Sequence, residues 1–157
     1  MTREDVLQGL KNRFAADILE VLDKSPKRVY IEIKPEAIRK TALFLYKDLG
    51  CRFNIASGMD TRRHFEILYH FILEDLNLQM SLRVKLPKDK PEIDSLAPQL
   101  EAANWVEREL HELLGVNFRG HPDLRKLLLP DDWPPGVYPL RQDYKEWDPK
   151  AIRDRGV

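Results

Sequence analysis

The four histidines are the side chains with the clearest potential for catalysis or metal binding. His111 and Glu112 match the first two residues of the zinc-binding helix pattern HExxH, but Gly115 stands where the second histidine is required. We therefore expect His111 to be a solvent-facing helix residue. His64 and His70 lie on one predicted strand, roughly 20 Å apart at ~3.3 Å per residue, which is too far for a shared metal ion. Both are expected on the outer or edge face of a sheet.

His121 lies between Gly120 and Pro122 in a predicted loop, where a histidine can be functional. The spacing fixes no serine, cysteine or carboxylate beside it. We therefore expect its imidazole to hold the turn through a backbone hydrogen bond or to contact a partner. The alternative is a stand-alone enzyme in which His121 works with Asp123 or Glu112 as acid and base.

Other patterns that bind ligands are absent or incomplete. The seven glycines form neither GxGxxG nor GxxxxGK, the two patterns that cradle nucleotide phosphates. Asp131 and Asp132 offer two carboxylates without further cation ligands. The charged run at 107–109, continued by Glu112, is typical of a solvated helix face or of pairing with charges on a neighbouring subunit. The sequence thus predicts no catalytic residue, cofactor site or metal site in this chain.

Length and composition predict one soluble domain. With 157 residues, of which 43% are hydrophobic, the chain can bury a core. Lys and Arg balance Asp and Glu at 26 each, so no basic field would recruit nucleic acid. No apolar run approaches the ~20 residues that span a bilayer, and any membrane association is therefore expected to come through a partner.

Cys51 is the only cysteine. A single cysteine excludes an internal disulfide, a CxxC redox pair and an iron–sulfur site ligated by four cysteines of this chain. We expect Cys51 to be a small buried residue at the start of a strand, in a reducing cytoplasm. The charged fraction of 33%, with few Asn and Gln residues, leans toward a thermophilic protein.

Hydrophobic periodicity predicts an α+β domain, since alternation marks strands and a 3.6-residue period marks helices. The predicted helices are 3–14, 35–50 and 96–114, and the predicted strands are 17–22, 28–34, 52–56, 64–74 and 78–86. Short turns join the last three strands. This favours a four- to five-stranded mixed or antiparallel sheet with helices packed on one face.

Residues 116–157 show no lasting period and are dense in proline, arginine and aromatic residues. A compact domain seldom carries such a run unless the run is functional, bound or disordered. Its apolar anchors argue against disorder, and they are Phe118, Trp133, Tyr138, Tyr144 and Trp147. We predict a domain at 1–115 that ends in the charged helix 96–114, followed by an extended arm at 116–157 that docks on a partner subunit.

The residues from Glu107 onward resemble the signature of a known family. The matching residues, in order and without gaps, are Glu107-Arg108-Glu109, Glu112-Leu113-Leu114-Gly115, Phe118, Gly120-His121-Pro122, Leu124, Arg125, Leu127-Leu128 and Pro130-Asp131-Asp132-Trp133. The family is the 30 kDa subunit of respiratory complex I, which is the C subunit of bacterial NADH:quinone oxidoreductase. It has relatives in membrane-bound nickel–iron hydrogenases and ferredoxin-dependent complexes. The preceding order of strands and helix is also similar, so the resemblance covers most of the chain.

The resemblance implies a cofactor-free structural subunit in the peripheral, hydrophilic arm of a membrane-bound, ion-translocating electron-transfer complex. Such a subunit lies on the cytoplasmic face of the membrane. It packs against the hydrogenase-like large subunit and the small iron–sulfur subunit, and it reaches the membrane subunits only indirectly. Iron–sulfur clusters are expected in the partner subunits, and neither nucleic acid nor a direct small-molecule substrate is expected.

The same resemblance separates two kinds of complex. Gln142 and Tyr144 stand where many respiratory members carry Lys and Phe. This departure favours a ferredoxin-linked hydrogenase-type or related archaeal or anaerobic complex. The alternative is the C subunit of an NADH:quinone oxidoreductase, and a second alternative is a stand-alone soluble enzyme or adaptor.

The roles that the resemblance implies are contacts with partners rather than catalysis. Glu107, Arg108 and Glu109 would form interface or arm-anchoring ion pairs. The turn Gly120-His121-Pro122 would launch the arm. The remaining expected interface residues are Phe118, Arg125, Trp133, Tyr138, Pro139, Leu140 and Arg141.

Overall fold

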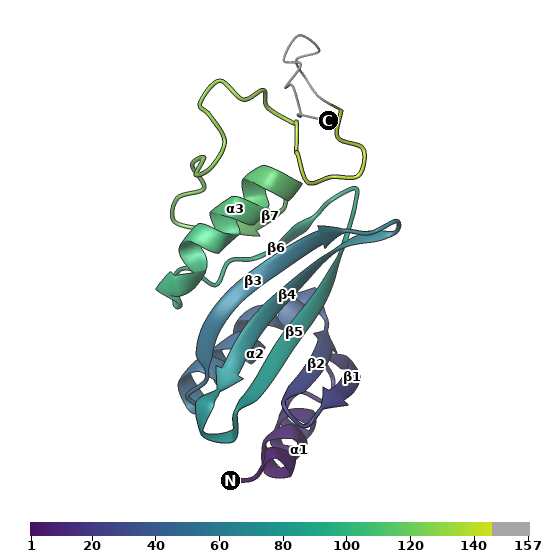
Figure 1. The fold of residues 1–157 in the computed structure, drawn as a ribbon, viewed down its shortest axis with the longest axis vertical. Helices are drawn as coiled ribbons and strands as arrows, with labels where there is room; N and C mark the ends of the chain where they lie inside the picture. Colours follow the sequence, from purple (N-terminus) through teal and green to yellow (C-terminus); the bar gives the residue numbers. More distant parts are fainter. Residues whose placement is uncertain (146–157) are drawn as a thin grey trace, which may run out of the picture.

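The computed structural model describes residues 1–145, which form one main sheet with helices on one of its faces (Figure 1). The helices are α1 (Arg3–Arg13), α2 (Ile38–Leu43) and α3 (Asn104–Leu114). The strands are β1 (Ile18–Ser25), β2 (Arg28–Ile33), β3 (Arg52–Asp60), β4 (His64–Leu73), β5 (Leu78–Pro87), β6 (Glu92–Asp94) and β7 (Asn117–Arg119). The five long predicted strands and the first two predicted helices are found at their expected places, with α2 extended by helical turns at both ends.

The main sheet has the strand order β1-β2-β5-β4-β3. β2 and β5 run parallel, whereas the other neighbouring strands run antiparallel. The predicted α+β fold with a mixed sheet is therefore confirmed. Alternation explains which side chains enter the core, since Phe65, Ile67, Tyr69 and Phe71 of β4 are buried on one face of the sheet.

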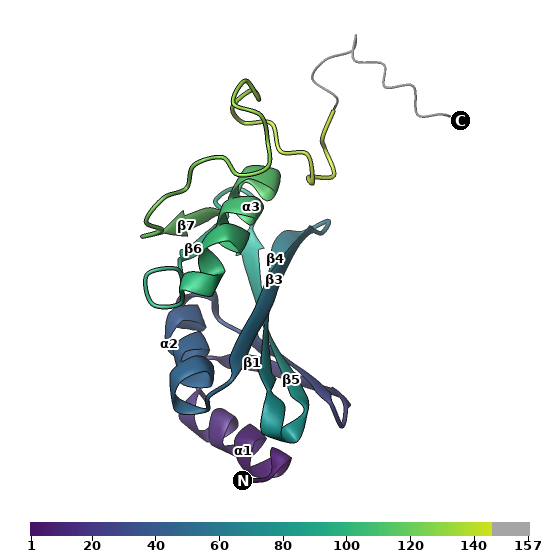
Figure 2. The ribbon, with the colours of Figure 1, turned by 60° about the vertical axis from the view of Figure 1, so that its left-hand side comes forward.

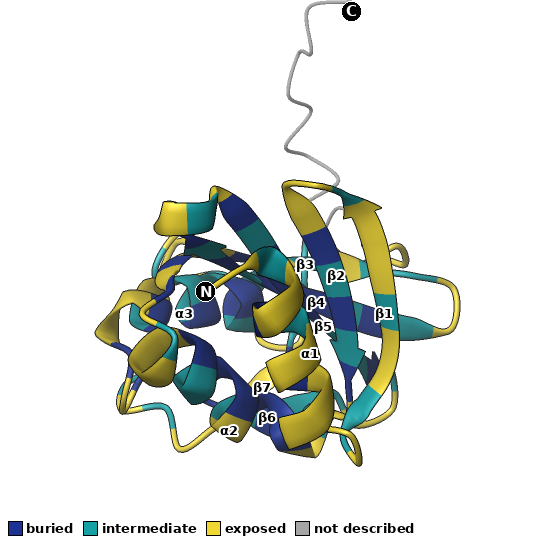
Figure 3. Cartoon of the chain, turned by 90° about the horizontal axis from the view of Figure 1, so that it is seen from below, coloured by how far each residue is buried: buried dark blue, intermediate teal, exposed yellow. Residues whose placement is uncertain are grey.

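The three helices cover the same face of the main sheet, as Figures 2 and 3 show from two directions. The hydrophobic core lies between these layers and includes Leu10 of α1, Ile38 of α2, Leu114 of α3 and Leu82 of β5. Full burial of each such side chain contributes about 1.5–3 kcal/mol. Within residues 1–145, no helix covers the opposite face of the sheet, which we call the open face.

Local sequence signals set the helix ends. Thr2 caps α1 through a reciprocal capping box with Asp5, whose carboxylate accepts from the Thr2 N–H at 2.8 Å. Pro35 opens the second helical region, where a missing N–H costs nothing. Gly50 ends that region with φ +67°, a left-handed conformation that favours glycine. Cys51 follows as a buried residue, as expected, and burial raises the pKa of its thiol to about 11.

β3 is longer than the predicted strand 52–56 and includes Gly58, which the sequence pattern assigns to a loop. A Cβ atom at Gly58 would lie 2.7 Å from Leu114 Cδ1 and 2.8 Å from Leu110 Cδ2. Glycine therefore allows α3 to lie directly against β3. This close approach explains why a residue typical of turns belongs to a strand here.

The predicted helix 96–114 is wrong at its start, because α3 begins only at Asn104. Residues 96–100 form turns, and a short 3-10 turn at Glu101–Ala103 follows. Leu96 and Leu100 stand at helical spacing, but both reach the core from these turns. Hydrophobic periodicity alone does not distinguish a helix from a series of turns that buries the same residues.

The fold continues past the predicted domain boundary at 115. β6 and β7 form a two-stranded parallel sheet in which Ile93 pairs with Phe118. Phe118 is 1% exposed, and Val116 is fully buried beside it. Residues 116–119 thus belong to the domain and not to an arm. A strand of three residues is too short to give an alternating pattern that sequence analysis could recognise.

Candidate partner-binding surface

α3 has one side in the core and one side toward the surface. Glu107, Leu110 and Leu114 are buried together, because residues three and four apart share one side of a helix. Trp105 and Arg108 lie on the other side by the same spacing, and Trp105 is 69% exposed. The charged run in this helix is therefore divided between the two sides.

Glu107 is completely buried, although its place in a charged run predicts a solvated or interfacial carboxylate. The carboxylate accepts hydrogen bonds from the Ser95 hydroxyl at 2.5 Å and from the Leu96 N–H at 2.7 Å. Burial raises the pKa of Glu107 to about 7, although these hydrogen bonds favour the ionised form. Burial, together with the charge of Glu107, also raises the pKa of Tyr69 on β4. Glu107 thus ties α3 to the turn that follows β6.

His121 holds the turn that follows β7. Its side chain is 0% exposed. Nε2 donates to the Asn104 carbonyl at 3.0 Å, and Nδ1 accepts from the Asp123 N–H at 2.9 Å. We assign the neutral imidazole with its hydrogen on Nε2 from these two bonds. The expected backbone role is confirmed. The Asp123 carboxylate, one of the two acid–base partners considered for His121, binds Arg125 at 2.7 Å.

His111 is half-buried rather than solvent-facing. Its Nδ1 donates to the Val116 carbonyl at 2.8 Å and so closes the C-terminal end of α3. Gly115 completes this ending with φ +77°. A Cβ atom at Gly115 would also lie 2.7 Å from the ring of Tyr138. Glycine is therefore needed here both for the backbone conformation and for the approach of the later segment.

Arg108 anchors the first half of residues 120–145, which we call the arm segment. Its guanidinium donates to the carbonyls of Arg125 and Lys126 at 3.0 and 2.9 Å. Lys126 in turn donates from Nζ to the Trp133 carbonyl at 2.9 Å. Arg108 thus has an arm-anchoring role, as the resemblance implies, but it acts through backbone carbonyls and not through an ion pair.

Glu112 is a second anchor of the arm segment. Its carboxylate accepts from the backbone N–H groups of residues 127–129, with Leu127 N at 2.9 Å. Backbone groups without a helix or strand partner need such a substitute when they are covered. Glu112 is 7% exposed, since the arm segment lies over it. The sequence analysis offers Glu112 a solvated helix face, charge pairing with a neighbouring subunit or an acid–base pair with His121, and it does not predict these contacts with the backbone of residues 127–129.

Arg141 anchors the second half of the arm segment. Its Nε donates to the Leu114 carbonyl at 2.7 Å, which is one of the free carbonyls at the end of α3. The guanidinium lies 4.2 Å from the ring centre of Tyr138 and 5.0 Å from that of Phe65 on β4. The following residue donates its N–H to the Asp60 carboxylate at 2.8 Å. In the described chain Arg141 therefore binds its own domain.

Trp133, which is expected to contact a partner, is half-buried within the arm segment. Its Nε1 donates to the Val137 carbonyl at 2.8 Å. Its ring stacks on Tyr144 with 6.4 Å between ring centres. Trp133 thus shapes the arm segment from within, while Trp147, the last expected anchor, lies outside the described residues.

The anchored backbone presents apolar side chains to solvent. Leu128 and Leu140 are 61% and 53% exposed. The N–H of Leu128 binds the Glu112 carboxylate, and the N–H of Leu140 binds the Leu113 carbonyl. Because these backbone groups are already fixed, binding a partner would order little additional chain. We call the exposed side chains of Trp105, Leu128 and Leu140 the α3 surface.

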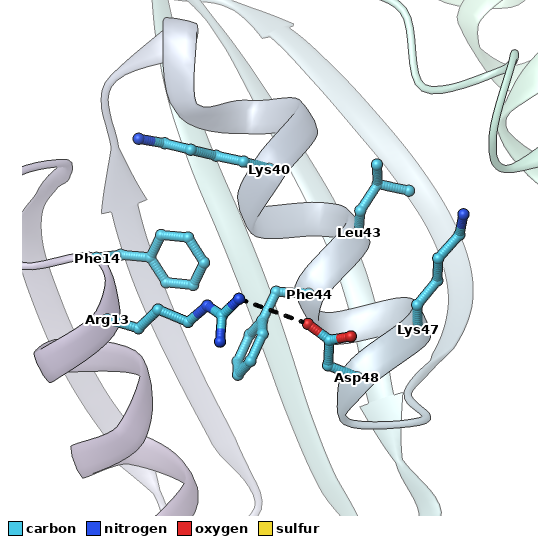
Figure 4. Close-up of a pocket in the computed structure, with 7 residues that line it drawn as sticks. All are labelled: Arg13, Phe14, Lys40, Leu43, Phe44, Lys47 and Asp48. Atoms are coloured by element: carbon cyan, nitrogen blue, oxygen red, sulfur yellow. Dashed lines mark ion pairs between the residues drawn. The ribbon is translucent and has the colours of Figure 1, made fainter.

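A shallow depression of about 340 Å³ between α1 and α2 does not have the character of a ligand site (Figure 4). Phe14 and Phe44 pack edge to face in it, and Arg13 lies 4.6 Å from the Phe44 ring centre. The ammonium groups of Lys40 and Lys47 point away from each other. Ligand pockets instead bring a few polar groups together. Among residues 1–145, no three His, Cys, Asp or Glu side chains are grouped to hold a metal ion.

Residues 31–150 match the family described as the 30 Kd subunit of respiratory-chain NADH dehydrogenase. The chain belongs to this family. The C subunit of F420H2 dehydrogenase from Methanosarcina mazei is 33% identical over 157 residues, which cover 98% of this chain and 99% of the relative. Formate hydrogenlyase subunit 5 of Escherichia coli is 31% identical over 145 residues, which cover 90% of this chain and 26% of that protein.

The fold of this chain is also found in a solved structure, that of the membrane-bound sulfane sulfur reductase, an archaeal respiratory membrane complex. The TM-score is 0.76 at 21% sequence identity, and the match covers 90% of this chain and 85% of the other. In the described part of the present chain, no helix is long and apolar enough to cross a bilayer.

Two signature residues of this chain do not lie where the resemblance predicts a contact with a partner subunit. Glu107 and Phe118 are inside the domain, so neither side chain is available to a partner in this structure. The sequence interpretation also missed Trp105 and Leu128. The helical phase of α3 would have placed Trp105 opposite the core, whereas no sequence signal distinguishes Leu128 from its leucine neighbours.

Proposed function

We propose that this chain is a cofactor-free structural subunit of a membrane-bound electron-transfer complex, and that it docks through the α3 surface and the arm segment. The observation that supports this most directly is the pair of exposed leucines on a fixed backbone. Leu128 and Leu140 are more than half exposed, although charged and polar groups hold the chain on both sides of them. Such side chains are suited to fill pockets on a partner.

The proposed partners are a hydrogenase-like large subunit and a small iron–sulfur subunit. The match to formate hydrogenlyase subunit 5 covers only 26% of that protein, so in that relative a domain of this kind is joined to a much longer polypeptide. Covalent joining supports close contact between the corresponding separate chains. The iron–sulfur clusters belong to these partners in our proposal, because Cys51 is the only cysteine of this chain and is buried.

Electron transfer explains why a redox-silent subunit is useful. Iron–sulfur clusters that pass electrons to one another must be held at fixed separations inside protein that excludes water. A folded domain with an arm along its partners braces the cluster-bearing subunits, and an interface well above ~2,000 Å² fits an obligate assembly of this kind. We place the subunit at the cytoplasmic face of the membrane, attached through its partners.

We favour a ferredoxin-linked hydrogenase-type or related archaeal or anaerobic complex. The full-length match to the C subunit of F420H2 dehydrogenase supports a complex outside the NADH-dependent group. The C subunit of an NADH:quinone oxidoreductase is the second candidate, because the family itself is described by that enzyme. NADH-binding flavoprotein subunits in the purified complex would decide for the second candidate.

The test is to recover a tagged chain from its native membranes in mild detergent and to identify the co-purifying subunits by mass spectrometry. The triple variant Trp105→Ala, Leu128→Ala, Leu140→Ala removes the α3 surface. We expect at least a tenfold loss of partners, since ~1.4 kcal/mol is a factor of ten and each buried side chain contributes more than that. Tyr46→Ala, at a residue 40% exposed beyond α2, is the control and should keep the partners.

Equal recovery with the triple variant, while its melting temperature is unchanged, would contradict docking through the α3 surface. A tagged chain that purifies alone would contradict the function itself. Trp133→Ala and Tyr138→Ala should each weaken assembly, and normal yield of the complex with both would show that neither is an anchor.

A further inference from the structure

The hairpin of β3 and β4 carries two neighbouring arginines at its free end. β3 ends at Asp60 and β4 begins at His64, so Arg62 and Arg63 lie in the turn between the two strands. Both arginines are exposed. The end of this hairpin projects sideways from the body of the domain (Figures 1 and 2). We call Arg62 and Arg63 the basic turn.

The backbone of the basic turn is fixed from both ends. The Thr61 hydroxyl donates to the His64 carbonyl at 2.6 Å and accepts from the His64 N–H at 3.2 Å. The Thr61 N–H donates to the same carbonyl at 3.0 Å. A contact with another molecule would therefore order the two arginine side chains but little backbone, which lowers the entropic cost of binding.

Within residues 1–145, neither arginine of the basic turn has an ion pair or a hydrogen bond through its side chain. The acids next to the turn in the two strands have other partners. Asp60 binds Lys88 at 2.6 Å. Glu66, on the open face, lies 2.8 Å from His64 and 3.7 Å from Arg83. The guanidinium groups of the basic turn therefore keep their N–H donors for another molecule.

Two further acids lie on neighbouring segments without pairing with the basic turn. Asp89 follows β5, whose last residue stands opposite His64, and Asp143 follows Gln142, which binds Asp60. Both acids are exposed, and neither has an ion pair among the described residues. They reduce the net positive charge at this end of the domain. The basic turn thus offers hydrogen-bond donors at close range and not a long-range basic field.

Two guanidinium groups on a fixed backbone are suited to bind carboxylates. Each presents parallel N–H donors that match the two oxygens of one carboxylate. An anionic membrane surface is instead recognised by clusters of about 4–8 Lys and Arg residues, and tight nucleic-acid binding uses about 6–10 phosphate contacts. Two arginines are too few for either. A protein that covers them must supply acids, because an unpaired charge is costly to remove from water.

The basic turn lies next to the second half of the arm segment. Gln142 donates its backbone N–H to the Asp60 carboxylate and its side-chain N–H to the Asp60 carbonyl, both at 2.8 Å. Asp60 stands two residues before Arg62. Leu140, two residues before Gln142, is 53% exposed and belongs to the α3 surface. A partner that covers Leu140 is therefore within reach of the basic turn.

We propose that the basic turn binds Asp or Glu carboxylates of the subunit that covers Leu140, and that it extends the α3 surface by a charged contact. This inference rests on the proposed function, since it assumes that the chain docks through that surface. It specifies the chemistry of the partner. The partner presents an apolar pocket for Leu140 and, beside it, an acidic patch for the basic turn.

The first test is zero-length cross-linking within the native complex. Arg63→Lys keeps the positive charge and places a primary amine in the basic turn. A carbodiimide joins this amine to a carboxylate that contacts it, and the reagent takes up the water that is released. Mass spectrometry of the detergent-purified complex then identifies the linked peptides. We expect a link from position 63 to an Asp or Glu of another subunit, which wild type does not give because a guanidinium group does not react.

The second test reverses the charge of the basic turn. The double variant Arg62→Glu, Arg63→Glu places carboxylates against the proposed carboxylates of the partner. We expect the partner to be recovered at least tenfold less well at low salt. The melting temperature of the variant should stay unchanged, because exposed charges contribute little to folding.

The control variant Lys24→Glu, Lys27→Glu makes the same change of charge in the hairpin of β1 and β2. Both lysines are exposed. The strand register places the turn of this hairpin at the start of β5 and the basic turn at the end of β5, so the two turns lie at opposite ends of the sheet. The control should keep the partner.

The other outcomes are also decisive. An intact complex without a link from position 63 to another subunit, or with unchanged recovery of the charge-reversed variant, would overturn this inference and leave the proposed function standing. Links to an acid of the same chain or of a second copy would overturn the choice of partner. A charge-reversed variant that keeps every subunit but loses binding to phosphatidylglycerol vesicles would assign the basic turn to the membrane and overturn the proposal. A chain that purifies without any partner would overturn the proposed function, and the inference with it.

Discussion

Replacing Glu107 by glutamine should remove a specific pH dependence of stability. The carboxyl is fully buried between α3 and the turn after β6, and burial raises its pKa from 4.5 to about 7. Glutamine has nearly the same shape, keeps an oxygen for the Leu96 N–H and turns its amide toward the Ser95 hydroxyl. It does not titrate. The variant therefore separates the ionisation of Glu107 from its packing.

The raised pKa of Glu107 determines whether stability rises or falls with pH. Below about pH 4.5 the carboxyl is protonated in both the folded and the unfolded chain, so its contribution to stability is fully present. Between about pH 4.5 and 7 the unfolded chain releases the proton while the folded chain keeps it, and the free energy of unfolding falls as pH rises. The difference in pKa corresponds to about 3 kcal/mol in total.

Urea unfolding at 25 °C, followed by tryptophan fluorescence at pH steps from 4 to 8, measures this contribution. We expect wild type to lose about 3 kcal/mol relative to Glu107→Gln across that range. Glu109→Gln, the same chemical change two residues on, is the control and should keep the wild-type slope. Parallel curves for wild type and Glu107→Gln would refute the raised pKa. A difference of opposite sign would show that the hydrogen bonds from Ser95 and Leu96 outweigh burial.

Three further outcomes are expected. Glu112→Gln should lower the local stability of the arm segment by about 2 kcal/mol, because it weakens a charge-assisted hydrogen-bond acceptor. Hydrogen exchange of the backbone amides at 127–129 should then become at least tenfold faster, whereas the control variant Glu109→Gln should leave the exchange rate unchanged. Gly58→Ala should cost about 1–3 kcal/mol and lower the melting temperature, since its Cβ would meet two leucine methyl groups of α3 within 2.8 Å, and an unchanged melting temperature would refute that contact. Cys51, with a thiol pKa of about 11, should react with a disulfide reagent at pH 8 at least 100-fold more slowly than it does in urea, and equal rates would show that it is accessible.

The sequence predicts those parts of the fold in which one pattern decides the structure. β4 and β5 alternate over ten residues each, and alternation of that length has no other regular explanation. Pro35 begins the second helical region and Gly50 ends it. The fixed φ of proline suits the first position, and the freedom of glycine allows the left-handed conformation at the end. Family membership was likewise predictable, because some twenty residues at fixed spacing form a specific signature.

The candidate surface was predicted less completely, because contacts from distant parts of the chain decide it. Phe118 was expected to be an anchor of an irregular run, but the parallel pairing with β6 brings it into the core. The predicted arm lying on a partner stays a prediction, since in the described chain Arg108, Glu112 and Arg141 bind residues 120–145 to their own domain. Each of these bonds joins residues between 15 and 27 positions apart, beyond the reach of local patterns.

By itself, the sequence determined the places of the five long strands, the ends of the first two helical regions and the family, since these depend on side-chain period, local backbone preference and residue order. Only the tertiary structure decided the roles of Glu107 and Glu112, two acidic residues five positions apart in one helix. Five residues turn a helix by about 500°, so one carboxylate faces the core and the other faces the arm segment. Which side is the core depends on where β3 and Gly58 meet α3, and that contact is set by packing.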